Sequence, residues 1–123
     1  MQTVLTYFFA LIMLSGALFH IISPNFYAEI TPDLVSLEFA NLISAIVEGL
    51  IGVALLLPKY RKYGALGFTL LMVVFLPIHI WDLAKEAPAV GSKTMALVRL
   101  GIQFLLIFGG WGLFRKLERS FCD

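Results

Sequence analysis

A small set of polar side chains lies within or beside stretches of sequence that are otherwise apolar, and these are the residues that could do chemistry. The set is His20, Glu38, Asn41, Ser44, Glu48, His79, Asp82, Arg99 and Gln103. A buried ionisable group is costly unless it is paired, so each of them needs a side chain or a ligand as its partner. Proton exchange, hydrogen bonding and ion pairing are the chemistry that these groups can supply.

The candidate for catalysis is Glu48, with a role in handling protons. Glu38, Asn41, Ser44 and Glu48 recur every three or four residues, which puts them on one face of a helix. Glu48 lies deepest in its apolar stretch, and a carboxyl group without complete pairing at that depth is a candidate proton donor or acceptor. Asn41 and Ser44 favour hydrogen bonds between helices, with contact to a ligand as the alternative.

Arg99 and Gln103 are one helical turn apart and share a second polar face. Because a guanidinium stays charged when it is buried, Arg99 needs carboxylates, and we expect Glu48 and Glu38 to provide them. Whether this pairing only braces the helices or also faces a ligand stays open.

The two histidines, His20 and His79, have three interpretations. They are hydrogen-bonding groups that lock helices together, contacts to a quinone or a proton-coupled ligand, or axial ligands of a haem. The haem is the weakest of the three, because two histidines alone carry little specificity. Cys122 is the only cysteine, so neither a thiolate metal cluster nor a CxxC redox pair can form within one chain, and no metal site is expected.

The elements that must position these residues are four apolar stretches, 4–22, 37–57, 64–81 and 95–113. Each is close to the length of about 20 residues that a helix needs to cross a bilayer. Because lipid cannot hydrogen-bond a bare backbone, stretches this apolar must be helical. The hydrophobic fraction of 60% exceeds the roughly 45–50% of soluble domains. We therefore predict an all-α integral membrane four-helix bundle that forms one domain over 1–123.

The basic residues beside the stretches predict the orientation of the bundle. Six of them fall on the side shared by both termini and the middle turn, and two fall on the other side. The positive-inside rule therefore puts both termini in the cytoplasm. The net charge of +1 gives no field for a polyanion, so nucleic acid is excluded as a partner, and the lipid bilayer is the expected surrounding.

Depth along the helices predicts where the polar residues meet. All four stretches carry polar groups towards their outer ends, whereas the inner half is nearly all apolar or glycine. This asymmetry predicts a pocket that opens outwards rather than a continuous channel. Pro77 is expected to kink the third helix near the pocket, Asp82 to lie at the interface, and Thr31, Pro32 and Asp33 to start the second helix.

Four segments within about 15–115 carry a family resemblance: SGALFHIISPNFY, VEGLIGVALLLPKYRK, LPIHIWDLA and VRLGIQFLLI. In order and spacing they resemble the DoxX family of small four-helix bacterial membrane proteins, which includes relatives of the DoxD subunit of thiosulfate:quinone oxidoreductase. The resemblance implies a bacterial inner-membrane protein associated with redox or respiratory metabolism. It also implies that recurring polar or kinked positions of the family are occupied here by His20, Glu48, Pro77, Arg99 and Gln103. The missing CxxC departs from relatives that resemble thiol-redox proteins, so disulfide chemistry is not expected.

The leading hypothesis is a small inner-membrane subunit that binds a quinone or another small amphipathic ligand and is associated with an oxidoreductase. In it Glu48 handles protons, Arg99 orients Glu48 and the ligand oxygens, and both histidines hydrogen-bond the ligand. The expected ligand contacts are His20, Glu38, Asn41, His79, Arg99 and Gln103. The alternative is a non-catalytic scaffolding protein whose polar cluster is structural. The partner would be a redox enzyme or a second copy of the chain, and whether any reaction occurs in this protein stays open.

Overall fold

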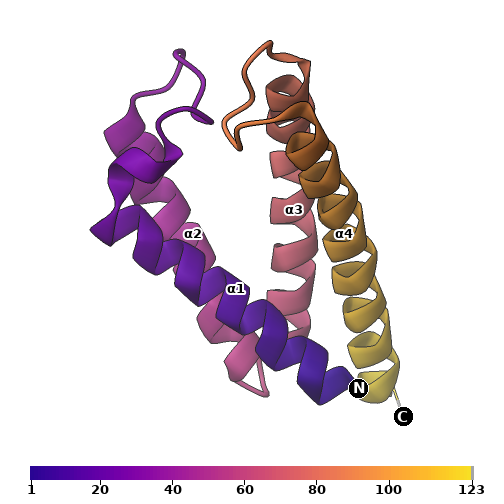
Figure 1. The fold of residues 1–123 in the computed structure, drawn as a ribbon. Helices are drawn as coiled ribbons and strands as arrows, with labels where there is room; N and C mark the ends of the chain where they lie inside the picture. Colours follow the sequence, from indigo (N-terminus) through magenta and orange to yellow (C-terminus); the bar gives the residue numbers. More distant parts are fainter. Residues whose placement is uncertain (123) are drawn as a thin grey trace.

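Four long helices make up most of the computed structural model, which describes residues 1–122 (Figure 1). Their bounds, with a short 3-10 helix after the first, are α1 Gln2–Ile22, η1 Pro24–Tyr27, α2 Leu37–Leu56, α3 Arg61–Ala84 and α4 Lys93–Cys122. All four long helices are long and apolar enough to span a membrane. The predicted all-α fold with four spanning helices is therefore confirmed at the level of secondary structure and hydropathy.

The second helix begins at Leu37, later than the Thr31 start that the sequence suggested. The Ser36 hydroxyl accepts a hydrogen bond from the Phe39 amide at 3.2 Å and so caps the first turn. Thr31 has another function, because its hydroxyl donates to the Tyr27 carbonyl at 2.8 Å and closes the turn that follows η1. The prediction of a start at Thr31 was wrong because the same cap-forming residue type also terminates turns.

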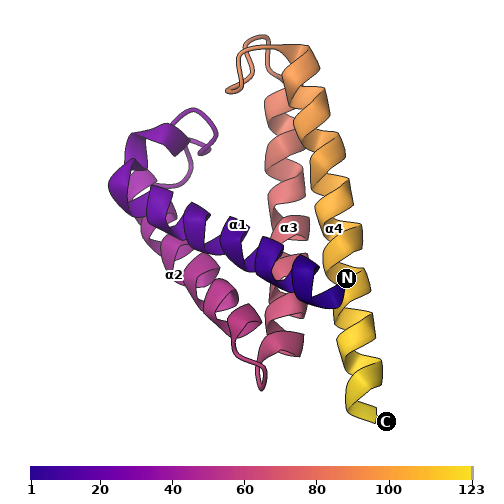
Figure 2. The same cartoon turned by 60° about the horizontal axis from the view of Figure 1, so that its bottom comes forward.

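The helices are arranged as two antiparallel hairpins. α1 packs along α2, and α3 packs along α4, while α2 and α3 are joined by the turn at 57–60. The hairpins meet at the end near this turn, called here the closed end, and separate towards the other, open end (Figures 1 and 2). The start of α1 and the end of α4 lie at the closed end in Figure 1.

The hydrophobic core lies where the hairpins meet. Phe9 of α1 stacks on Phe68 of α3, with ring centroids 4.3 Å apart. Leu55 of α2 and Leu113 of α4 are buried in the same cluster, whose other buried members are Ala10, Met13, Ala65, Met72 and Phe114. All four helices thus contribute to one core, and this core holds the two hairpins together.

The turn between α2 and α3 is held by close backbone packing. A Cβ on Gly64 would lie 2.7 Å from the Leu55 amide nitrogen, so only glycine allows the two helices to approach this closely. The Arg61 guanidinium donates to the Leu55 carbonyl at 3.0 Å and satisfies an orphan carbonyl at the end of α2. The turn therefore fixes how α3 leaves α2.

α3 runs through Pro77 without interruption and ends at Ala84 rather than at the predicted residue 81. Asp82 is therefore part of the last turn of a helix, where its side chain has a fixed direction. α4 likewise continues to Cys122, beyond the predicted end at residue 113.

Candidate functional site

The polar residues form two separate clusters, one in each hairpin. The α1–α2 hairpin carries His20, Asn41 and Glu48, and the α3–α4 hairpin carries Asp82 and Arg99. The sequence predicted that all four helices would direct these groups into a single pocket. The hairpins separate at the open end, so side chains of the two clusters pair within their own hairpin.

In the α1–α2 hairpin, Asn41 and Glu48 bracket the imidazole of His20. His20 Nδ1 lies 2.7 Å from Asn41 Oδ1, and His20 Nε2 lies 3.4 Å from Glu48 Oε1. Asn41 and Glu48 are seven residues apart, which is about two turns of one helix face, so both can reach the same ring. The exposed fractions are 9% for His20 and 5% each for Asn41 and Glu48, so the three side chains are buried together.

The segment after α1 holds this arrangement in place. The Asn41 amide nitrogen donates to the Pro24 carbonyl at 3.1 Å. The Tyr27 ring stacks on the His20 ring, with centroids 3.8 Å apart and an interplanar angle of 16°. Burial, and to a smaller extent the charge of Glu48, raises the pKa of the Tyr27 phenol above its usual value of 10.0. Tyr27 was not predicted as part of the site, although its place in the SPNFY turn shortly after His20 was a usable signal.

Glu48 fits against α1 because residue 16 is glycine. A Cβ on Gly16 would overlap the Glu48 carboxylate, with Oε2 as the nearest atom. The missing side chain thus leaves room for the carboxylate beside the α1 backbone, below His20. Gly16 was not predicted as part of the site, because a single glycine within an apolar helix gives no sign of what fills the space beside it.

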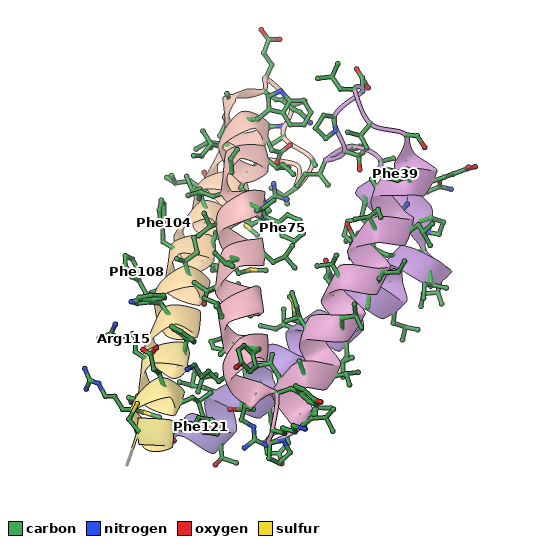
Figure 3. All side chains as sticks on the ribbon, turned by 180° about the vertical axis from the view of Figure 1, so that it is seen from behind. Phe39, Phe75, Phe104, Phe108, Arg115 and Phe121 are labelled. Atoms are coloured by element: carbon green, nitrogen blue, oxygen red, sulfur yellow. The ribbon has the colours of Figure 1, made fainter. Side chains whose placement is uncertain are left out.

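A cavity of about 450 Å³ lies between α2 and α3, under the segment that joins η1 to α2. Its apolar wall includes Phe39 and Ile43 of α2 and Val74, Phe75 and Ile78 of α3. Figure 3 shows Phe75 on the side of α3 that faces α2. The polar groups that line it are His20, Tyr27, Thr31, Asn41, Ser44, Glu48 and His79. The cavity therefore has apolar sides, with the His20 and Glu48 side chains in its wall.

His79 contributes to this cavity from α3. Its Nδ1 atom is buried and has no hydrogen-bond partner among residues 1–122. The structure thus brings four of the predicted site residues to one cavity: His20, Asn41, Glu48 and His79.

In the α3–α4 hairpin, Asp82 is fully buried and pairs with Arg99. Arg99 Nη2 lies 2.6 Å from Asp82 Oδ2. The other oxygen, Oδ1, accepts from the Ala89 amide at 2.9 Å and lies 3.3 Å from Lys85 Nζ. Asp82 thus joins α3, the following loop and α4 at the open end.

This arrangement corrects the predicted partners of Arg99. Arg99 does not pair with Glu48 or Glu38, because those carboxylates belong to the other hairpin. Asp82, which the sequence placed at the interface, lies in the last turn of α3 because the helix continues past Trp81, and its carboxylate is buried under the loop. The Arg99 Nε atom is buried without a hydrogen-bond partner within the described residues.

Gln103 and Glu38 lie away from the cavity. Gln103 is buried and donates to the Met72 carbonyl at 2.6 Å, which links α4 to α3. Glu38 is exposed in the first turn of α2 and lines a groove of about 710 Å³ formed by α1, η1, Ser36 and α2. Of the predicted ligand contacts, Glu38, Arg99 and Gln103 are therefore not part of the cavity wall.

The site has no cluster suited to a metal ion. No group of three or more His, Cys, Asp or Glu side chains within the described part of the chain could hold one. Both ring nitrogens of His20 face side chains, Asn41 on one side and Glu48 on the other, which leaves neither free to ligate a haem iron. The arrangement is suited instead to hydrogen bonding and to the exchange of a proton.

Residues 9–114 match a family described as a domain of unknown function (DUF8561). The matched range contains every residue of the cavity wall and of both polar clusters. No curated protein and no solved structure matches the chain.

Proposed function

Since the chain belongs to the DUF8561 family, whose description states no activity, we propose a function from the site itself. The protein is a multi-pass protein of the bacterial inner membrane that binds a small neutral amphipathic molecule, such as a quinone, between α2 and α3. The observation that carries this proposal is that an apolar cavity has the buried His20 and Glu48 side chains in its wall.

The outer surface of the helices supports a membrane setting. Large apolar side chains are exposed on every helix, among them Leu11 at 64%, Leu50 at 67% and Phe108 at 70%. Figure 3 shows Phe104 and Phe108 pointing away from the other three helices. A water-soluble monomer rarely exposes so much contiguous apolar surface, whereas lipid would cover it.

The charge distribution supports the orientation with both termini in the cytoplasm. Six basic residues flank the closed end: Lys59, Arg61, Lys62, Arg115, Lys116 and Arg119. The loop after α3 at the open end has two, Lys85 and Lys93. By the positive-inside rule the closed end is cytoplasmic, and the cavity then lies in the half of the bundle that faces outwards.

The size and lining of the cavity support an amphipathic ligand. A volume of about 450 Å³ lies within the range of roughly 300–1,000 Å³ that is usual for small-molecule sites. The apolar body of the ligand would pack between Ile43 and Phe75, and its oxygens would contact Glu48, His20 and His79. Glu48 keeps the proton-handling role that its depth suggested. Arg99 acts indirectly, because it fixes Asp82 and thereby the open end of α3.

A direct binding experiment tests this function. A benzoquinone with a decyl tail is titrated into the purified wild-type protein and into Val74→Phe, which fills the cavity from α3. Val73→Phe is the matched control, because Val73 and Val74 are adjacent and both exposed, and Val73 lies outside the cavity wall. We expect Val74→Phe to weaken binding by about tenfold or more, which is about 1.4 kcal/mol, and Val73→Phe to leave it unchanged. Equal binding by both variants would contradict a ligand site between α2 and α3.

The second candidate is a scaffolding protein that recruits a redox enzyme or a second copy of the chain. Its support is that Asp82 and Gln103 form their hydrogen bonds and ion pairs within the α3–α4 hairpin, as bracing groups would. Under this alternative, wild type and Val74→Phe bind no quinone, and crosslinking in membranes captures the same partner from both.

A further inference from the structure

The direction of the Asn41 amide determines which nitrogen of His20 carries a proton. The Pro24 carbonyl can only accept a hydrogen bond, so the group that Asn41 turns towards it must be the NH₂. Asn41 Oδ1 therefore faces His20 Nδ1, at 2.7 Å. Because an amide oxygen only accepts, Nδ1 must be the donor and carry a hydrogen.

This tautomer leaves His20 Nε2 as a lone pair facing a carboxyl group. Nε2 lies 3.4 Å from Glu48 Oε1, and an unprotonated nitrogen facing an ionised carboxylate would be repulsive. One additional proton removes the conflict, either on Nε2, giving imidazolium and carboxylate, or on Glu48, giving imidazole and carboxylic acid. Both forms have zero net charge, so the proton belongs to the pair rather than to either residue.

The same geometry restricts the route by which a proton can leave the His20 and Glu48 pair. Asn41 Oδ1 accepts a hydrogen bond from Nδ1 but cannot take up its proton and pass it on. The imidazole of His20 therefore cannot transfer a proton through Nδ1. The exchangeable proton is therefore on the side of Nε2 and Glu48. The titratable groups that line the cavity beside the pair are Tyr27 of η1 and His79 of α3.

We propose that Asn41 is a positioning residue that makes His20 and Glu48 a one-proton site, and that this site selects neutral ligands carrying a hydroxyl or carbonyl group. A hydroxyl can donate to the carboxylate form of the pair, and a carbonyl can accept its proton. A charged head group would lose its hydration in the cavity without gaining a counter-charge, because the pair is neutral. The ligand preference rests on the proposed function, whereas the tautomer rests on the geometry of the ligand-free protein.

Nitrogen NMR of ¹⁵N-histidine-labelled protein tests the tautomer without any ligand. The chain has two histidines, so His79→Gln leaves His20 as the only signal. We expect a hydrogen on Nδ1 in this background, and an Nε2 shift that moves towards the unprotonated value when Glu48→Gln is added, because glutamine donates to a neutral ring. A hydrogen on Nε2 alone before that change would overturn the proposal.

Two further variants test the role of Asn41 in the same background. Asn41→Asp still accepts from Nδ1, so it should keep the Nδ1 tautomer. Asn41→Leu cannot accept, so the Nδ1 hydrogen should move to Nε2 and be donated to a carboxyl oxygen of Glu48, which then holds the other proton of the pair. An unchanged spectrum in Asn41→Leu would show that Asn41 does not set the tautomer. If Asn41→Leu does not fold, the His79→Gln spectrum still decides the question.

The ligand preference is measured with three probes that share a decyl chain: a benzoquinone, a trimethylammonium and a sulfonate. We expect the benzoquinone to bind at least about tenfold more tightly than either ion. Equal affinities would overturn the selection of neutral ligands. Absence of binding by all three, together with the expected tautomer, would reject the proposed function but leave the one-proton site standing.

Discussion

Arg99 and Asp82 pair at 2.6 Å across the α3–α4 hairpin, and Asp82 has no exposed surface. Asp82 is therefore a buried carboxylate, and its negative charge is balanced by Arg99, Lys85 and the Ala89 amide. Removing one partner of a buried ion pair costs about 3–5 kcal/mol when the other charge is left unpaired. Lys85 Nζ, 3.3 Å from Asp82 Oδ1, still faces the carboxylate after the change, which puts the loss at the lower end of this range. We expect Arg99→Met to lower the free energy of unfolding by about 3 kcal/mol, measured by denaturation in mixed micelles.

The control for this prediction is the more exposed pair between Lys62 and Glu118, 3.9 Å apart. Glu118→Gln should cost less than about 1 kcal/mol. The double variant Asp82→Asn with Arg99→Met should recover part of the loss, since no uncompensated charge remains. If Arg99→Met and Glu118→Gln lowered the free energy of unfolding equally, the result would contradict the burial of the Asp82 carboxylate.

Gly16 and Glu48 are coupled by space rather than by charge. An added methyl group at residue 16 would overlap the end of the Glu48 side chain and displace its carboxylate from His20, so Gly16→Ala should destabilise the protein by about 1 kcal/mol, the lower end of the cost of overpacked sites. Gly101→Ala is the matched control, because a Cβ there meets nothing within 4 Å. That change should be neutral or slightly stabilising, given the higher helix propensity of alanine.

A double-mutant cycle distinguishes this overlap from a general effect on α1. Once Glu48→Ala has removed the carboxylate, Gly16→Ala should cost little. The same loss in both backgrounds would mean that the methyl group at residue 16 meets something other than Glu48.

The environment of Tyr27 predicts its behaviour in alkali. Burial and the Glu48 charge raise the pKa of its phenol above 10.0, so the folded protein releases this proton later than the unfolded chain does. The difference in tyrosinate absorbance between wild type and Tyr27→Phe should therefore have its midpoint above pH 10.0. The stability contributed by the protonated phenol is complete below that pH and is lost as pH rises through the folded pKa. A midpoint at or below 10.0 would place Tyr27 in water instead of against His20.

The native cysteine provides a test of orientation. With both termini in the cytoplasm, a membrane-impermeant maleimide added to intact cells should not label Cys122. In a Cys122→Ser background, Ala87→Cys in the exposed loop after α3 should be labelled. Labelling of Cys122 together with protection at position 87 would invert the topology.

The four helices were predictable from the sequence because hydropathy reports directly on apolar length. The pairing of their polar residues was not. Arg99 had several carboxylates as candidate partners, and placing the end of α3 at residue 81 removed Asp82 from consideration. The His20 and Glu48 contact was missed for a related reason. Counted along the helices from their outer ends, His20 lies near the end of its helix and Glu48 lies near mid-membrane. The two side chains meet because α1 approaches α2 closely at Gly16.

The most direct test of the ligand site is mass spectrometry of an organic extract from the purified protein, compared with Glu48→Gln and with Gly101→Ala as a control. We expect a neutral amphipathic molecule, such as a quinone, to be enriched in wild type and in Gly101→Ala and depleted in Glu48→Gln. Phospholipid alone in all three extracts would contradict the proposed binding of a ligand beside His20 and Glu48, and would favour the scaffolding alternative.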